Sequence, residues 1–344
     1  MGEVRGFGIT HYPLLAGLDE NMNSILHRNL KDPETPEAEK DPKSWPKQMQ
    51  EEWADPIGAA QRHRADLVKG MDTVRQALDD FNPDVVIMWG DDQYELFREE
   101  IIPPFCILAF DEQVVHPFAH GRPNIWGEGP DKELKINMDG EVGRFFAEQL
   151  LHNNFDASYS YKMREGAPFP HAFLNAFLYL DYHRNNPFNY TTVPISVNCY
   201  GSHVIANHGG GTLFGDKVRL DPPSPTPDRC MQLGAAIARI AEQSPYRVAL
   251  MASSGWSHAF LTDKTWRLQP DVASDKRLYK ALTEQDYNSW HKTTTAQIED
   301  AGQQEVLNWF CLLGAMEELK RKPLYTDFLE VYTFNSSKVF AIYE

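Results

Sequence analysis

Four segments of the sequence place side chains that can bind a metal or move protons directly after a short apolar run. They carry His11, then Asp91, Asp92 and Gln93, then His203, and finally Ser257 and His258. In open α/β sheets, ligands bind in the crevice beyond the carboxyl ends of the strands. One such strand end is weak evidence, because turns favour polar residues in any case. Four of them in one chain predict a shared cleft.

Two common catalytic motifs are missing from the sequence. A nucleophilic serine would need Gly-x-Ser-x-Gly between a strand and a helix, and residues 253–257 do not match that pattern. The glycines at 209–211 lack both the Lys-Ser/Thr of a phosphate-binding loop and the Gly-x-Gly-x-x-Gly spacing. The sequence therefore disfavours a serine hydrolase or a nucleotide-binding protein, and the histidines hold the remaining chemical interest.

The composition excludes several classes of protein. The chain has 344 residues with 33 basic and 49 acidic side chains, a formal net charge of −16. This balance disfavours duplex nucleic acid and anionic membranes as partners, because both reward clustered Lys and Arg. No apolar run reaches the roughly 18 residues of a membrane-spanning helix, and we see no signal peptide. The four cysteines form neither a CxxC metal motif nor a disulfide framework. We expect a soluble cytoplasmic protein.

Short apolar runs alternate with helical patterns, which indicates repeated βαβ units. Strands are predicted at 4–9, 83–89, 192–199 and 247–252, with a strand pair within 331–343. Helices are predicted at 56–81, 139–152, 171–182, 226–241 and 303–321. Residues 16–54 are polar and contain several prolines, so we interpret them as a surface insertion. The pattern predicts a single α/β domain over 1–344, with a mostly parallel or mixed central sheet flanked by helices on both faces.

The strand ends also carry a family resemblance. The run Gly8–Leu15, which contains His11, resembles the first metal-ligand turn of the class III extradiol ring-cleavage dioxygenases. More narrowly, it is similar to the superfamily of the protocatechuate 4,5-dioxygenase β subunit. Further matching motifs follow in order over nearly the whole chain apart from 16–54. They are Pro83–Ile87, Ile101–Phe105, Val197-Asn198, Asp221–Pro223, Arg229-Cys230, Leu233-Gly234, Gly255–His258, Gly302, Glu305, Trp309, Gly314–Met316 and Val331–Thr333.

The resemblance implies a particular chemistry. The family holds Fe(II) with two His and one Glu, and a separate His acts as acid and base beside the bound catechol. Two imidazoles and a carboxylate on one face of the ion leave the other face open for substrate and O2. The resemblance therefore implies an oxidoreductase of aromatic catabolism with His11 as its first metal ligand. It further implies a homo-oligomer, with a small partner subunit as an option.

The sequence departs from the family's pattern at three positions. Gln93 stands where the second ligand would be a His, and an amide oxygen is a weaker donor than imidazole. Glu165 stands where the acid/base His of a His-Gly-x-x-x-Pro stretch would be. The carboxylate ligand would follow the Ser-His turn by some twenty residues, where no Glu occurs. Asp271 is the best-placed carboxylate and Asp275 the next.

Two interpretations of these departures stay open. In one, the protein is an active enzyme with a rebuilt metal site of His11, Gln93 and Asp271, in which Asp91 or Asp92 could be a substitute ligand. In the other, the chain has lost iron and is a metal-free lyase or hydrolase for a cyclic substrate, or a silent partner subunit. We favour an enzyme that acts on a catechol-like or related cyclic aromatic substrate. We expect it to bind Fe(II) weakly or not at all.

These interpretations assign roles to further residues. Catalytic roles fall to Glu165, His258 and His203, with Glu165 in place of the family's acid/base His. Substrate-binding roles fall to Tyr12, Trp256 and Asp92. We expect His11, Gln93, Glu165 and His258 to converge in one pocket with aromatic surface.

Overall fold

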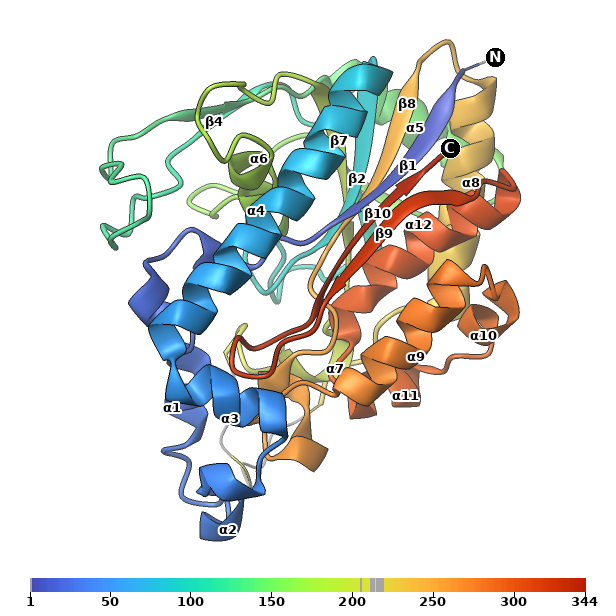
Figure 1. Cartoon of the computed structure of the whole chain (residues 1–344). Coiled ribbons are helices and arrows are strands. Elements are labelled where there is room, and N and C mark those ends of the chain that lie inside the picture. Colours follow the sequence, from blue (N-terminus) through green and yellow to red (C-terminus); the bar gives the residue numbers. More distant parts are fainter. Residues whose placement is uncertain (1, 205, 211–213, 215–219) are drawn as a thin grey trace.

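The computed structural model describes residues 2–204, 206–210, 214 and 220–344, without the side chains of residues 203 and 204. Within these residues, eight strands form one mixed sheet in the order β6-β3-β7-β2-β8-β1-β10-β9 (Figure 1). The strands are β1 (Val4–Ile9), β2 (Val85–Asp91), β3 (Phe105–Leu108), β6 (Ser158–Ser160), β7 (Thr191–Val197), β8 (Val248–Ser253), β9 (Pro323–Leu329) and β10 (Lys338–Tyr343). β4 (Gln113–Val115) and β5 (Leu134–Ile136) form a separate hairpin.

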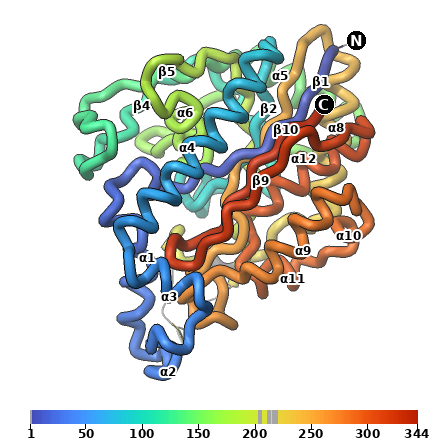
Figure 2. Tube along the Cα trace, in the orientation of Figure 1, coloured from blue at the N-terminus to red at the C-terminus, as the bar shows by residue number. Residues whose placement is uncertain are grey.

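Four neighbouring strands at the centre of the sheet, β7, β2, β8 and β1, run parallel. The first and last strands, β1 and β10, lie side by side and antiparallel (Figure 2). β9 is antiparallel to β10, and β3 is antiparallel to β7. The predicted α/β fold with a mixed sheet is confirmed. Because the central parallel strands all end at the same edge, side chains that follow them gather there.

Helices cover both faces of the sheet. α4 (Pro56–Phe81) and α6 (His171–Leu180) pack on one face, and α5 (Gly140–His152), α8 (Pro227–Gln243) and α12 (Leu307–Glu318) pack on the other. The remaining helices are α1 (Ser24–Asn29), α2 (Glu37–Lys40), α3 (Lys47–Ala54), α7 (Gly201–Val204), α9 (Val272–Thr283), α10 (Tyr287–His291) and α11 (Thr295–Asp300). None of the helices in the described part of the chain is long and apolar enough to cross a membrane.

The core is divided between the two faces by the two-residue period of the strands. Along β2, Val86 and Met88 join the cluster under α4 and α6, whereas Ile87 and Trp89 join the cluster under α8 and α12. Both faces of the central strands are therefore buried, which explains why they appear in the sequence as continuous apolar runs.

Most predicted elements are found close to their predicted bounds. The helix predicted at 56–81 is confirmed: the Asp55 side chain accepts the Gly58 N–H at its start, and Asn82 ends it in the left-handed region at φ 48°. The predicted C-terminal strand pair exists, but its bounds are wrong. Its first strand is β9, Pro323–Leu329, and residues 330–337 form the long connection to β10. The turn residues within 331–337 favoured a tight hairpin in the sequence, whereas the structure uses them as a loop at the strand ends.

Residues 16–54 carry α1, α2 and α3 and lie at the lower left of Figure 1. Their apolar side chains Leu26, Trp45 and Met49 pack with Leu268. The buried Glu52 carboxylate accepts the backbone N–H groups of residues 332 and 333, at 3.1 and 2.8 Å. We propose that the whole chain is one domain with this segment as an insertion, because it packs against loops at the strand ends.

α8 and α12 cross with almost no space between their backbones. A Cβ on Gly234 would lie 1.7 Å from the carbonyl oxygen of Cys311, and a Cβ on Gly314 would lie 2.1 Å from that of Met231. Only glycine allows such an approach. Since Glu305 lies in the 3-10 turn directly before α12, this crossing sets the position of the Glu305 carboxylate beside the sheet.

Candidate active site

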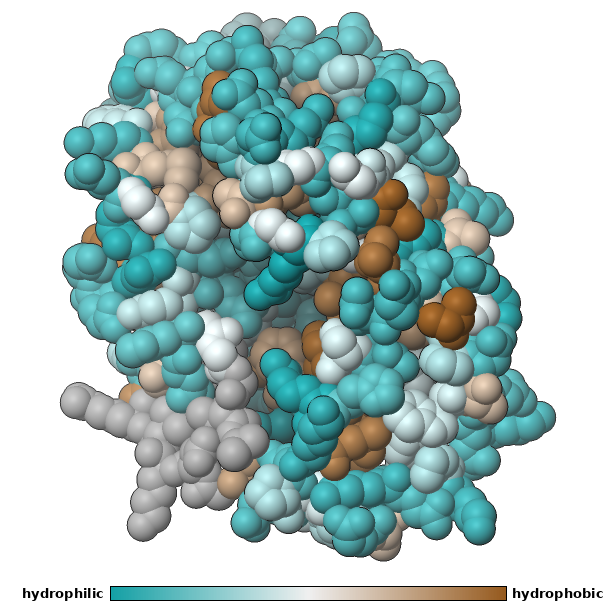
Figure 3. Space-filling model, turned by 90° about the vertical axis from the view of Figure 1, so that its left-hand side faces the viewer, coloured by the Kyte–Doolittle hydropathy of each residue, from teal (hydrophilic) through white to brown (hydrophobic). Residues whose placement is uncertain are grey.

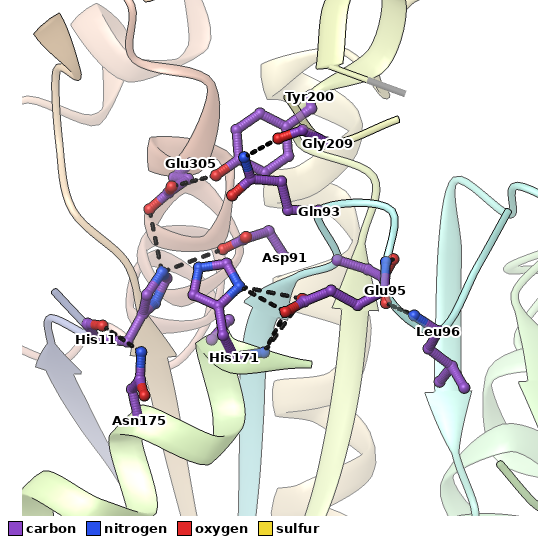
Figure 4. Close-up of polar contacts among 12 residues, drawn as sticks. His11, Asp91, Gln93, Glu95, Leu96, His171, Asn175, Tyr200, Gly209 and Glu305 are labelled. Carbon is purple, nitrogen blue, oxygen red and sulfur yellow. Dashed lines mark hydrogen bonds and ion pairs between the residues drawn. The ribbon is translucent and has the colours of Figure 1, made fainter. Parts of the chain in front are cut away.

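A cluster of ionisable side chains lies at the carboxyl ends of the central strands (Figure 4). His11 lies two residues after the end of β1, and Asp91 is the last residue of β2. β8 lies between these strands in the sheet, and His171, the first residue of α6, approaches from the helical layer. One ligand atom from each of His11, Asp91 and His171 lies within 4.8 Å of the others. Two imidazoles and one carboxylate therefore face a common point.

Glu305 connects this cluster to a third histidine, His258. Its Oε2 lies 3.4 Å from His11 Nε2, and its Oε1 lies 3.2 Å from His258 Nε2. The Tyr200 hydroxyl and the Gly255 N–H also donate to the carboxylate. Burial raises the pKa of Glu305 to about 7, against the hydrogen bond from Tyr200, which lowers it. Glu305 is thus a buried carboxyl group that three side chains and one backbone amide hold in a single orientation.

The orientation of His11 is fixed by its surroundings. Its Nδ1 donates to the Ser253 carbonyl oxygen at 3.0 Å, so Nε2 is the nitrogen that faces Asp91 and Glu305. The Asn175 amide donates to the His11 carbonyl oxygen at 3.1 Å. Burial lowers the pKa of His11 well below 6.5, and His171 and His258 lower it further. A neutral imidazole with Nε2 unprotonated is the form that binds a metal ion.

His171 is held by Glu95 from the loop after β2. The Glu95 carboxylate accepts from His171 Nδ1 at 3.1 Å and from the His171 backbone N–H at 3.1 Å. Burial by itself would lower the pKa of His171, but Glu95, followed by Asp91 and Glu305, raises it to about 10. The other ring nitrogen of His171 is directed toward His11 and Asp91 (Figure 4).

Asp91 provides the test of whether these residues suit a metal ion. The side chain is fully buried, and neither carboxylate oxygen has a hydrogen-bond partner in the described part of the chain. His11 Nε2 lies 3.7 Å from Oδ1, and this imidazole is neutral because burial lowers its pKa. Burial, and then Glu305, raises the pKa of Asp91 well above 3.8. A buried carboxylate without partners is unfavourable unless it is paired or coordinates a metal. The donor set of two His and one carboxylate fits Fe(II).

A cavity of about 1020 Å³ reaches this cluster. His171, Glu95, Gln93 and Asn175 line it on the side of the cluster. Its apolar lining includes Leu14, Phe118, Phe169, Leu174 and Leu178. The segments 13–24 and 114–124 contribute to the cavity, and Figure 3 shows the side of the molecule on which they lie, with a hollow in its surface. The size and the mixed lining suit a small aromatic molecule.

The predicted metal ligands fall in different places. His11 lies in the cluster as described. Gln93 lines the cavity, but its amide donates to the Gly209 carbonyl oxygen at 2.7 Å, and the grouped donor atoms come from Asp91 and His171. The structure therefore does not show Gln93 as the substitute for a ligand His. Strand β2 ends with Asp91, which belongs to the donor group, and the Gln93 amide two residues later is engaged by the Gly209 carbonyl oxygen.

The carboxylates predicted after the Ser-His turn have structural roles. Asp271 caps α9 through the Ser274 N–H and pairs with Lys264 at 2.5 Å. Asp275 is fully buried and accepts from the Ser257 N–H at 3.0 Å and from the Gln303 amide at 2.7 Å. Glu305 provides the carboxylate beside the histidines in place of both. The spacing counted from the Ser-His turn predicted a carboxylate at the start of α9, whereas Glu305 lies about thirty residues after Asp275 in the chain.

Of the three residues predicted to be catalytic, His258 is in the cluster through its contact with Glu305. Glu165 is exposed on the loop before α6, next to Gly166 at φ 70°, so the structure does not bring it to the cluster. The loop turns outward there, and His171, six residues later, is the residue that points inward. The backbone of His203 lies in α7, but its side chain lies outside the described residues.

The predicted substrate contacts are all buried. Trp256 packs against Trp309 in the core, with ring centroids 5.6 Å apart, and does not line the cavity. The Tyr12 hydroxyl donates to the Met22 carbonyl oxygen at 2.9 Å, so this ring serves packing near the cluster. Asp92 accepts backbone N–H groups of residues 95–97 and closes the turn after β2. Pattern alone could not separate aromatic core residues from a pocket wall.

The sequence reasoning missed the roles of His171, Glu95 and Glu305. His171 follows directly on the segment that was compared with the family's acid/base motif, and it was interpreted as a helix-start residue. It is that as well, because α6 begins at His171. Glu305 was among the family-like residues, without a role. The available signal in the sequence was their position, because His171 and Glu305 each stand at the start of a largely apolar segment.

Comparisons with known proteins give the context of this site. The family model of the catalytic LigB subunit of aromatic ring-opening dioxygenase matches residues 218–340. The predicted resemblance to the class III extradiol dioxygenases is confirmed. His258 and Glu305 lie in the segment that the family model matches, whereas His11, Asp91 and His171 precede it.

Two curated relatives are similar to part of the chain. A 2,3-dihydroxyphenylpropionate/2,3-dihydroxicinnamic acid 1,2-dioxygenase 2 of Pseudomonas putida is 26% identical over 184 residues, which are 54% of this chain and 46% of the relative. The 2,3-dihydroxyphenylpropionate/2,3-dihydroxicinnamic acid 1,2-dioxygenase of Comamonas testosteroni is 26% identical over 190 residues, 55% of this chain and 48% of the relative. The chain thus spans about half the length of the curated relatives that it matches.

Proposed function

We propose that the protein is a ring-cleavage dioxygenase for a catechol-like aromatic substrate and that His11, Asp91 and His171 hold its Fe(II). The observation that carries this proposal is the group of two imidazoles and one carboxylate, with His11 and Asp91 buried and His171 half-buried, beside a cavity of about 1020 Å³. The family likeness supports the reaction class. The donor types are those of the family, but two of the three residues differ from the ones predicted by sequence position.

Bound iron would supply open coordination positions at which a catechol and O2 can meet. The protein's own groups would hold the ion and exclude water. Leu174 and Phe169 offer apolar contact to an aromatic ring in the cavity. Burial and Lys338 lower the pKa of His258 to about 3, so this imidazole stays neutral. The Glu305 carboxyl lies 3.2 Å from His258 Nε2, accepts the Tyr200 hydroxyl and has a pKa raised to about 7, so Glu305 is the group that would hold a proton here.

Oxygen uptake with a panel of catechols, gallate-like acids and aminophenols tests the proposal. The protein is reconstituted anaerobically with Fe(II), and ring fission is followed as a yellow product. His171→Gln should lower turnover at least a hundredfold, whereas His152→Gln, an exposed His at the end of α5, should leave it unchanged. Equal turnover of the two variants would contradict the role of His171. Silence of the reconstituted protein across the panel would contradict the dioxygenase assignment.

A metal-free enzyme for a cyclic substrate is the second candidate. The ion pair between Glu95 and His171 favours it, because a protonated imidazole at a cavity wall can act as an acid without any metal. Turnover in the presence of a chelator and in the absence of O2 would support this candidate against the first.

We also propose that the chain forms a homo-oligomer, and a silent subunit is the alternative to an active enzyme. Light scattering of the purified chain gives its oligomeric state. If the chain gains oxygen uptake only after a small partner chain is added, the interpretation as a partner subunit is supported.

A further inference from the structure

We propose that Glu95 is a positioning residue that aims His171 into the candidate metal centre, and that Asp92 holds Glu95 in place. This inference rests on the metal site proposed above. Neither residue belongs to the cluster of donor atoms, and both lie on the short loop that follows Asp91.

The loop after β2 is built around the Asp92 carboxylate. This carboxylate is buried and accepts the backbone N–H groups of residues 95, 96 and 97 at 3.0, 2.8 and 3.3 Å. Tyr94 adopts a positive φ of 62°, which turns the chain sharply between Asp92 and Glu95. Side-chain acceptance of several consecutive N–H groups fixes a local backbone conformation. The position of Glu95 is therefore set relative to Asp91, one residue before Asp92.

Glu95 makes two kinds of contact with His171. One is with the backbone N–H at the start of α6, where a carboxylate is favoured by the helix dipole. The other is with Nδ1, which lies 3.1 Å from each carboxylate oxygen. Because Nδ1 is engaged, Nε2 is the nitrogen left to face His11 and Asp91 (Figure 4). Metal-binding histidines commonly donate their second ring N–H to a carboxylate, and this partner sets the orientation of the ring.

A helix cap alone would need only the backbone contact. The contact with Nδ1 adds control of the imidazole, and it predicts an effect on metal binding that is separate from stability. Glu95→Gln keeps the shape of the side chain and removes its charge. Glu95→Asp keeps the charge and withdraws the carboxylate by one methylene. Glu100→Gln is the matched control, since Glu100 lies on the same loop and is exposed, 3.9 Å from Arg164.

The probe is Co(II), titrated anaerobically into the full chain and followed by its visible absorption and by competition with a chelating dye. We expect Glu95→Gln and Glu95→Asp to bind Co(II) about 10–100-fold more weakly than the unmodified chain, the range found for such supporting residues. Glu100→Gln should bind with unchanged affinity. The thermal midpoint in chelator, measured for each variant, separates a structural effect from a positioning effect.

Each result decides between outcomes. Weaker Co(II) binding in a Glu95 variant that keeps its thermal midpoint in chelator supports the inference. Unchanged affinity and absorption in both variants would overturn it and leave the proposed metal site intact. If Glu95→Gln does not fold, Glu95→Asp provides the same comparison, because it keeps a negatively charged carboxylate at the start of α6. A folded, unmodified chain that binds no Co(II) would overturn both this inference and the proposed function.

Discussion

Replacement of Asp91 by Asn should make the metal-free protein more stable. The carboxylate of Asp91 is fully buried, has no hydrogen bond from the described residues, and lies close enough to Glu305 for the two acidic groups to repel each other. An Asn of the same shape cannot ionise, and its NH2 group can donate to His11 Nε2, which faces the same point. The substitution thus relieves an unfavourable buried group without opening a cavity.

The size of the effect follows from the desolvation of one unsatisfied buried group, about 1–3 kcal/mol. For a chain of 344 residues, an unfolding entropy of about 2.1 cal/mol/K per residue gives roughly 0.7 kcal/mol per degree. Asp91→Asn should therefore raise the thermal midpoint by about 1.5–4 °C in chelator. Asp156→Asn, an exposed Asp, is the control and should not change the midpoint measurably.

A divalent metal should make the unmodified chain more stable than Asp91→Asn. At a concentration one hundred times its Kd, a ligand of the folded state adds about 2.7 kcal/mol of stability. The unmodified chain should gain that stability with Co(II), whereas Asp91→Asn, having lost a ligand, should gain little. Differential scanning calorimetry of both proteins, first with chelator and then with Co(II), measures the two thermal midpoints. A lower midpoint for Asp91→Asn in chelator, or an equal response of both proteins to Co(II), would refute the reasoning.

Three further predictions concern packing, pH and substrate. Gly234→Ala should lower the free energy of unfolding by about 2 kcal/mol or more in denaturant titrations, because its Cβ meets the backbone of α12, whereas Gly129→Ala in an open loop should not. Burial raises the pKa of Asp275 from 3.8 to about 7, so the folded state retains a proton that the unfolded state releases. The free energy of unfolding should therefore fall as the pH rises from about 4 through 7. The stability of Asp275→Asn should decline less steeply over that range, in which Glu305 still contributes, and curves of equal slope would exclude the contribution of Asp275. Leu174→Ala shortens a side chain of the cavity wall one turn after His171. In steady-state kinetics it should raise KM for an aromatic substrate about tenfold and change kcat less. A decrease in kcat alone would argue against contact between Leu174 and the substrate ring.

The sequence by itself determined the class of fold and the edge at which chemistry gathers. Continuous apolar runs such as 85–89 identified buried strands, because parallel strands covered on both faces need apolar side chains in both directions. The polar residues directly after those runs located the strand ends, and His11 was found in this way. The run around His11 and the motifs that follow also carried the likeness to extradiol dioxygenases, which the family model supports over 218–340.

The tertiary structure alone decided which residues complete the cluster. His171 begins a helix and Glu305 lies within a 3-10 turn before another, on opposite faces of the sheet. Each is brought to the strand ends by helix packing that no local pattern encodes. Position counting instead selected Gln93, Glu165 and Asp271, because it assumes that the site is preserved at the same points of the chain. Side-chain direction depends on the backbone turn at each position. The loop before α6 leaves Glu165 exposed and the Gln93 amide donates to Gly209, whereas Asp91 and His171 bring their donor atoms together with His11.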